Sequence, residues 1–223
     1  LAPGELRVYR LPRRDVNGTV QQALAYRVTS SVPIIAYQFN PLENENVFSN
    51  DASLLLPATL LGKDYVVMTR EQTFETLRGY LTVVAVLPGK TMVSVDVSAH
   101  VMGGSVYPQT PDEQEIPPMQ PGDTRIFELD QYDVLSLETD RPGADLTGSR
   151  ILSDQRIAVF GGSEASNAPN TARCVDIDPV SGDGVCEYDG ETICKDLLDC
   201  VSQGFNTCCA DHLEQQLFPV KPW

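Results

Sequence analysis

The sequence predicts an all-β protein built from sandwich-like units, and three observations support this. Apolar and polar residues alternate along several short segments, as they do in strands with one buried face. β-Branched and aromatic residues fill these segments, and turn residues separate them at short distances. In residues 92–98, for example, the three valines fall on one face and Ser94, Asp96 and Ser98 on the other.

Strands are predicted at residues 6–11, 24–29, 34–39, 65–69, 80–87, 92–98, 125–129, 134–138 and 157–160. Pro88-Gly89 predicts a hairpin turn between two of them, because proline presets the first turn dihedral and glycine accepts a positive φ. Pro121-Gly122 and Pro142-Gly143 predict two further turns.

Two segments depart from this pattern. Residues 103–121 hold five prolines and three acids, a composition that predicts a long exposed loop. In residues 193–203, Cys194, Leu197, Leu198 and Val201 recur at helical spacing and predict one short helix.

An internal duplication is also predicted, because residues 27–39 align with 150–162 and residues 54–57 with 216–219. The offset grows from 123 to 162 residues, so the second copy would carry an insertion of 39 residues. We therefore expect a first β unit at 1–149 and a truncated second unit at 150–223, with a cysteine-rich insert at about 170–210. Since the second copy stops in mid-unit, we expect the chain to be part of a longer polypeptide.

All six cysteines lie in that insert, and the first 173 residues contain none. No C-x-x-C pair is present, so the spacing favours disulfides over a zinc site and predicts an oxidising compartment: extracellular, cell surface or periplasm. The sequence leaves their pairing open. The predicted disulfide residues are Cys174, Cys186, Cys194, Cys200, Cys208 and Cys209.

The chain is acidic, with 31 Asp and Glu against 16 Lys and Arg and a net charge of −15. Such a field repels nucleic acid and anionic lipid surfaces, so neither is expected as a partner. The longest uncharged apolar runs have about half the roughly 20 residues of a membrane helix, and no transmembrane segment is predicted.

Six blocks of sequence resemble the amino-terminal domain of IgGFc-binding proteins: PIIAYQF at 33–39, NDASLLLP at 50–57, LGKDYVV at 61–67, DLTGS at 145–149, IAVFGG at 157–162 and DHLEQQLFP at 211–219. The family includes mucus-associated animal proteins and secreted bacterial ones, and the chain is interpreted as a bacterial extracellular member. The resemblance implies a β-rich binding or scaffolding module without known catalytic activity. Antibody binding is not carried over to this chain.

No catalytic or cofactor-binding residue is predicted. The two histidines, His100 and His212, lack a supporting motif, and residues 161–165 are not G-x-S-x-G but a glycine-rich turn after a strand. His212, with Asp211 and Glu214 nearby, has the residue types of a metal site or a tuned imidazole. The alternative that we favour is a structural histidine bonded to backbone.

The sequence offers three candidate ligands for calcium. Asp176, Asp178 and Asp183 lie close in sequence beside two glycines, and carboxylate oxygens are the ligands that Ca²⁺ prefers. The spacing does not match an EF-hand loop, and a chance acidic cluster is the alternative.

The function predicted from the sequence is a non-enzymatic extracellular or cell-surface binding or adhesion module with a protein or glycan partner. One alternative is a structural subunit that self-associates through exposed strand edges. The other is a secreted polysaccharide hydrolase, which needs two facing carboxylates in a cleft.

Overall fold

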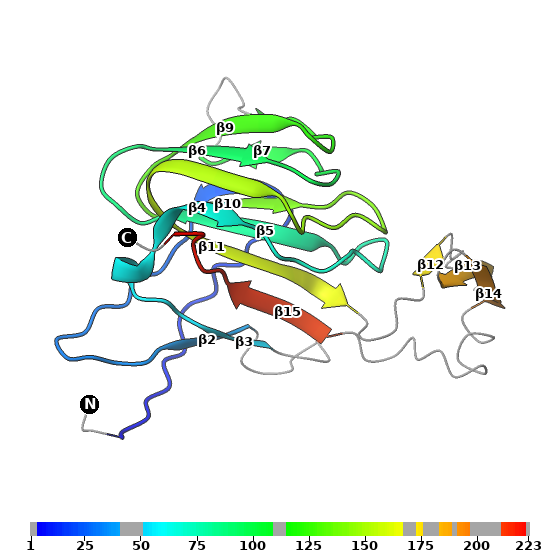
Figure 1. The fold of residues 1–223 in the computed structure, drawn as a ribbon. Helices are drawn as coiled ribbons and strands as arrows, with labels where there is room; N and C mark the ends of the chain where they lie inside the picture. Colours follow the sequence, from blue (N-terminus) through cyan, green and yellow to red (C-terminus); the bar gives the residue numbers. More distant parts are fainter. Residues whose placement is uncertain are drawn as a thin grey trace.

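The computed structural model describes residues 4–40, 51–108, 115–166, 173–175, 183–188, 191–196 and 211–221, with the three ranges between 173 and 196 in backbone only. These residues form strands and one 3-10 turn, which confirms the all-β prediction (Figure 1). The elements are β1 Thr19–Ala23, β2 Tyr37–Asn40, β3 Asp51–Leu54, η1 Ala58–Leu60, β4 Gly62–Val66, β5 Gly79–Ala85, β6 Thr91–Asp96, β7 Gly104–Val106, β8 Glu115–Ile116, β9 Thr124–Leu129, β10 Asp133–Glu138, β11 Arg150–Ser166, β12 Arg173–Val175, β13 Asp183–Tyr188, β14 Glu191–Asp196 and β15 Asp211–Gln216.

Ten strands form one sheet in the order β8-β7-β1-β10-β5-β11-β6-β9, with β4 and β15 also paired to β11. The paired strands within this sheet are antiparallel, except for β1 and β7, which run parallel to each other. Strands β2 and β3 form a separate two-stranded sheet, and β12, β13 and β14 form a three-stranded one.

Strand β11 curls the large sheet into two layers. Residues 150–153 pair with β6, whereas residues 157–163 pair with β5, and the register with β4 shifts between Leu152 and Ile157. An irregularity of this kind lets one strand pass from one layer to the next. The predicted sandwich is thus a single sheet folded over on itself.

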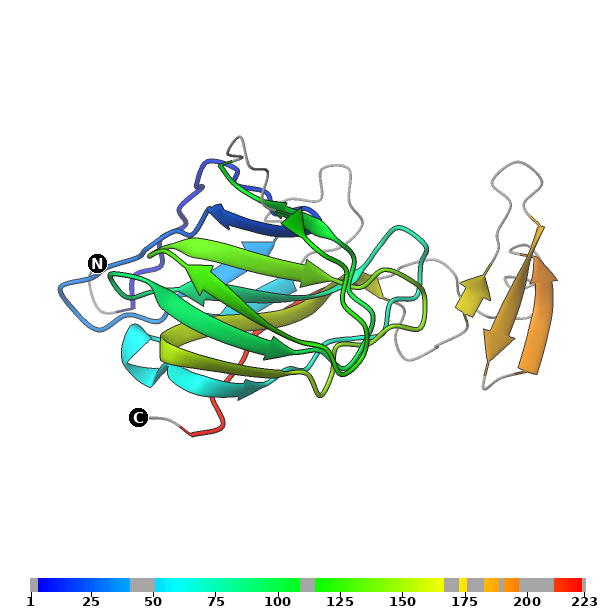
Figure 2. The ribbon, with the colours of Figure 1, turned by 90° about the horizontal axis from the view of Figure 1, so that it is seen from above.

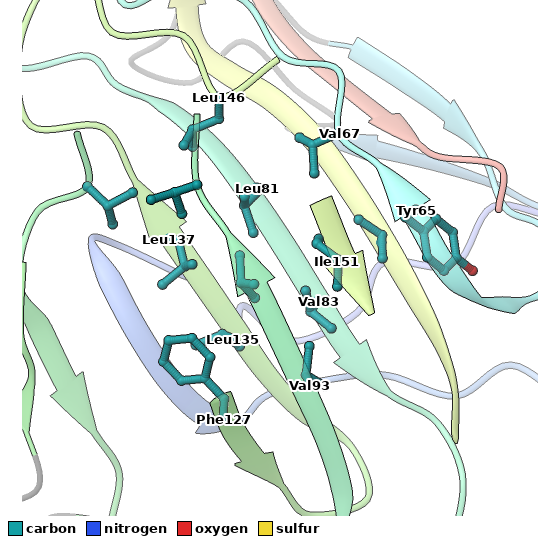
Figure 3. Close-up of a cluster of buried hydrophobic side chains, with 14 of the residues drawn as sticks. Tyr65, Val67, Leu81, Val83, Val93, Phe127, Leu135, Leu137, Leu146 and Ile151 are labelled. Atoms are coloured by element: carbon teal, nitrogen blue, oxygen red, sulfur yellow. The ribbon is translucent and has the colours of Figure 1, made fainter. Parts of the chain in front are cut away.

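The core fills the space between the layers. Val93 of β6 and Phe127 of β9 face Leu81, Val83 and Leu135 of β5 and β10 (Figure 3). Each fully buried side chain of this size contributes about 1.5–3 kcal/mol relative to an exposed one. The alternation predicted for residues 92–98 is confirmed, because its three valines are 0–1% exposed.

Seven of the predicted strands are found wholly or in part. Residues 80–87, 92–98, 125–129, 134–138 and 157–160 coincide with β5, β6, β9, β10 and the middle of β11, while 34–39 and 65–69 overlap the ends of β2 and β4. The strands predicted at 6–11 and 24–29 are wrong, since neither segment forms a strand and most of their residues are exposed. An alternating pattern marks a strand-forming preference, but pairing also requires a neighbouring strand.

The three predicted turns are present, with φ of +87° at Gly89, +87° at Gly122 and +84° at Gly143. The hairpin at Pro88-Gly89 is nevertheless wrong. Strands β5 and β6 both pair with β11 and not with each other, so this turn carries the chain from one layer to the other.

The predicted loop at 103–121 is also wrong in part. Its two arms form β7 and β8 at the edge of the sheet, and Ile116 and Met119 are buried in the core. Residues 109–114 lie outside the described chain.

The duplication is not supported. Residues 27–36 are irregular and 150–162 lie within β11, so the two proposed copies have different surroundings. Residues 54–57 and 216–219 do not occupy equivalent positions but touch, since Leu56 N–H donates to Gln216 Oε1 at 2.6 Å. The predicted boundary after Ser149 falls inside the large sheet, because β11 pairs with β4, β5 and β6.

The cysteine-rich region contains β12, β13 and β14, whose backbone register places Cys174 opposite Cys186 and Cys186 opposite Cys194. The helix predicted at 193–203 is wrong at its start, because residues up to Asp196 belong to strand β14. The rest of that helix and Cys200, Cys208 and Cys209 lie outside the described residues, so the disulfides remain a prediction.

Candidate functional site

The two-stranded sheet formed by β2 and β3, here called the ribbon, has two chemically different faces. Its register pairs Tyr37 with Leu54 and Phe39 with Ala52, and it pairs Gln38 with Ser53 and Asn40 with Asp51. Directly paired residues of an antiparallel sheet share a face. One face is therefore apolar and aromatic, and the other is polar.

The polar face is fastened to β15. The Asp51 carboxylate accepts a hydrogen bond from the Glu214 backbone N–H at 2.6 Å, and the Ser53 hydroxyl accepts one from the Gln216 N–H at 2.8 Å. Strand β15 pairs with β11 along its other edge. Side chains of β3 thus take the place of a further strand and protect an edge that would otherwise be open.

The carboxylate of Glu214 joins the ribbon to the large sheet. It accepts hydrogen bonds from Gln38 Nε2 at 2.7 Å, from Asn40 Nδ2 at 3.3 Å and from the Tyr80 hydroxyl at 3.3 Å. Burial raises the pKa of Glu214. Burial, followed by the negative charge of Glu214, raises the pKa of Tyr80 well above its usual value.

His212 lies beside Glu214 and Tyr80. Its Nδ1 lies 3.2 Å from the backbone carbonyl of Glu164 and donates to it, and its ring stacks on Tyr80 with centroids 6.2 Å apart. Its Nε2 lies 3.4 Å from the Tyr80 hydroxyl. This bond to backbone is the structural arrangement that we favoured for His212, with β2 and β5 side chains as its neighbours.

A second buried carboxylate lies on β10. Glu138 accepts a hydrogen bond from the Gly18 N–H at 2.7 Å, and Arg78 Nε lies 3.9 Å from its other oxygen. Burial, with a smaller contribution from the charge of Glu164, raises the pKa of Glu138 from 4.5 to about 7. The Glu164 carboxylate in turn accepts a hydrogen bond from the Arg78 backbone N–H at 2.8 Å.

The segment predicted as a glycine-rich turn, residues 161–165, is part of β11. A Cβ on Gly161 would lie 2.1 Å from the Met68 carbonyl oxygen, and one on Gly162 would lie 2.1 Å from that of Leu213. Glycine is therefore required by close packing of neighbouring backbone. Ser163 is buried and donates to the Ala165 carbonyl at 3.1 Å.

A hollow of about 370 Å³ is lined by residues 98–100, 121 and 141–145. The Nδ1 of His100 is buried there and has no hydrogen-bond partner among the described residues. Asp145 is the one carboxylate of the lining, and its Oδ1 already accepts bonds from Thr69 and Thr147. Because glycoside hydrolysis requires a pair of facing carboxylates, the hollow gives the hydrolase alternative no support.

The predicted calcium ligands are not placed by the structure. Asp176 and Asp178 lie outside the described residues, and Asp183 begins β13, which is described in backbone only. Among the side chains that are described, no group of three or more His, Cys, Asp or Glu is arranged to hold a metal ion. Within the same part of the chain, no helix has the length and apolar character needed to cross a membrane.

The sequence drew attention to His212 and Glu214 but not to the partners that hold them. Gln38, Asn40, Asp51 and Ser53 carry a usable signal, since each alternates with an apolar neighbour in a short strand. That signal shows a polar face, but it does not show that this face meets β15.

Comparison with known protein families identifies a match to this chain. The family model described as IgGFc binding protein matches residues 51–181, more than half of the chain, from the start of β3 to beyond β12. No curated protein and no solved structure matches the chain.

Proposed function

The chain belongs to the IgGFc-binding protein family, and from this membership we propose that it is a non-enzymatic protein-binding module that works outside the cell. The apolar face of the ribbon is the surface best suited to contact a partner. A glycan partner has no comparable support, because it would need polar groups beside the aromatic rings.

The observation that carries the proposal is the exposure of aromatic side chains on a fixed support. Tyr37 is 57% exposed and Phe39 is 53% exposed, while the face beneath them is bonded to β15 through Asp51, Ser53 and Glu214. Aromatic residues are frequent among those that dominate the energy of protein interfaces. A surface that is already held in place loses less conformational entropy on binding.

The proposed location is the extracellular space, the cell surface or the periplasm. The support is the family, whose members are typically extracellular, and a cysteine spacing that favours disulfides over zinc. The cross-strand register of Cys174 with Cys186 agrees with this, because directly opposed residues are close enough to be considered for a bridge.

Surface plasmon resonance on the immobilised chain tests the proposal. The probes are purified immunoglobulin Fc, which the family description names, and a panel of other purified secreted proteins. We expect saturable binding of at least one probe, weakened about tenfold or more by Tyr37→Ser with Phe39→Ser, as for aromatic residues at the centre of an interface.

Met68→Ser is the matched control, since Met68 is 62% exposed and lies outside the ribbon. It should leave the affinity unchanged. Absence of saturable binding across the panel would contradict the protein-binding function. Binding that survives the Tyr37 and Phe39 substitutions would contradict the assignment of the ribbon.

A further inference from the structure

Strands β12, β13 and β14 form a small sheet of their own within the described part of the cysteine-rich region (Figure 2). Apart from three cysteines, the large apolar and aromatic residues of these strands are only Val175, Val185, Tyr188 and Ile193. A three-stranded sheet needs a hydrophobic face to be stable by itself in water, and small extracellular units with little core commonly depend on disulfides. The positions of the cysteines in this sheet therefore bear on its stability.

Cys174 and Cys186 are directly opposed in a regular part of the ladder between β12 and β13. The pairs before and after them follow the same register, without a shift. Directly opposed residues of an antiparallel pair share a face, and their Cα atoms are about 4.5–5.5 Å apart. This separation lies within the range of about 4.4–6.8 Å that disulfides require. The backbone thus places these two cysteines where a bridge can form.

Cys194 has a different relation to Cys186, although the two are also paired. Their pair lies at an irregularity between β13 and β14, with a register shift on each side of it. The pairs beyond the two shifts follow one common register, in which Cys194 would be opposite Val185. Because successive residues of a strand lie on opposite faces, that register places Cys194 on the other face from Cys186. A bridge between them is therefore disfavoured.

A bond between Cys174 and Cys194 is excluded while the sheet is formed. Strand β13 lies between the strands that carry them. Neighbouring strands are about 4.8 Å apart, so residues two strands apart are separated by roughly 9.5 Å. Cysteines whose Cα atoms are more than about 7 Å apart cannot be bridged without movement of the backbone. Of the three cysteines in this sheet, Cys174 and Cys186 alone meet the requirements of both separation and face.

We propose that Cys174 and Cys186 form a disulfide that joins β12 to β13, and that Cys194 takes no part in it. The bond forms by thiol–disulfide exchange with a disulfide-bearing oxidant of the compartment. The two cysteine thiols lose two electrons and two protons as their S–S bond forms, and the oxidant's S–S bond takes them up and becomes two thiols. The inference rests on the oxidising location proposed above and adds the pairing, which the sequence leaves open.

The proposed bond has a definite place in the chain. Cys174 lies within residues 51–181, which match the family, and Cys186 lies beyond them. The bond therefore links the end of the matched region to residues that the family model does not cover. Strand β12 has only three residues and offers few backbone hydrogen bonds, so the disulfide is what keeps it beside β13.

Disulfide mapping of the native chain, secreted into an oxidising compartment of the expression host, is the first test. Free thiols are alkylated at mildly acidic pH without reductant, which suppresses exchange because the thiolate is the attacking species. Cleavage before aspartate then places the three cysteines in separate peptides, residues 154–175, 183–188 and 189–195. The first two peptides should be recovered as one linked species, which is lost on reduction.

Serine variants provide the second test. Cys174→Ser should gain one alkylated group, located at Cys186, and Cys186→Ser should gain one at Cys174. Cys194→Ser is the matched control, because it should keep the linked species intact and gain its alkylated group outside residues 174–186.

The number of free thiols in the wild-type chain separates this proposal from the proposed location. Six free thiols would overturn both. Oxidised cysteines in which Cys186 is joined to Cys194, or to any cysteine other than Cys174, would overturn the pairing and leave the location standing. The wild-type map does not depend on whether any variant folds.

Discussion

The buried carboxylate of Glu138 makes a specific prediction about stability and pH. Its side chain is 6% exposed, and its pKa rises from 4.5 to about 7, chiefly because burial disfavours the charged form. A raised acid pKa means that the folded protein binds this proton more tightly than the unfolded chain does. The contribution of Glu138 to stability is therefore complete below about pH 4.5 and is lost as the pH rises through about 7.

The magnitude follows from the size of the shift. Each pKa unit corresponds to about 1.4 kcal/mol, so a change from 4.5 to about 7 corresponds to about 3 kcal/mol of unfolding free energy. Glu138→Gln keeps an oxygen that can accept the Gly18 N–H but carries no charge at any pH. The variant should resemble the wild type near pH 4.5 and exceed its stability by about 3 kcal/mol at pH 8.

Urea denaturation of both proteins at several values between pH 4.5 and 8, followed by circular dichroism, measures this difference. Comparing the two proteins at each pH removes the contributions of other titrating groups. If the two stability curves run parallel across this range, Glu138 does not titrate as its burial requires, and the reasoning fails.

Three further predictions concern the ribbon, β11 and the cysteines. Ser53→Ala should lower the unfolding free energy by about 1–3 kcal/mol, because a buried N–H of β15 loses its acceptor, whereas Ser94→Ala on the outer face should stay within about 0.5 kcal/mol in the same urea assay. Gly161→Ala should prevent or severely weaken folding, seen as lost dispersion in an NMR spectrum, because its Cβ would lie 2.1 Å from the Met68 carbonyl oxygen. Mass spectrometry of the native protein after alkylation without reductant should show no added groups on the six cysteines, and six added groups would contradict the proposed oxidising location.

The sequence predicts individual strands better than their partners. The valines of residues 92–98 are recognisable because burial of one face leaves a local alternation. The hairpin predicted at Pro88-Gly89 is wrong because the same turn residues can join two paired strands or two strands that lie in different layers. Which of these forms depends on β11, which lies about 60 residues further along the chain and pairs with both β5 and β6.

The polar run at residues 153–156 shows a related limit of sequence patterns. The chain continues through this run as β11 and only shifts its register there, with Ser153 Oγ donating to the Gln155 carbonyl at 2.6 Å. Polar residues mark a local interruption of the ladder, and they do not specify whether the chain reverses. The number of residues in the run is compatible with either outcome.

In the contact between the ribbon and β15, the sequence drew attention only to the residues of β15. His212 and Glu214 attract attention because titratable residues stand together, and the backbone-bonded role expected for His212 has a direct counterpart in its contact with Glu164. Asp51 and Ser53 were not predicted as their partners, because about 160 residues separate the two halves of the contact. A single sequence contains no information on which distant polar faces meet.

The position of β11 in the sheet has a consequence for biosynthesis. Strands β4, β5 and β6 leave the ribosome well before β11, yet each has β11 as a neighbour in the sheet. A nascent chain that ends before Arg150 therefore lacks the strand that links both layers, and its apolar inner faces remain accessible to chaperones or to aggregation. Closure of the two layers therefore waits until residues 150–166 have emerged from the ribosome, and it does not proceed gradually from β4 onward.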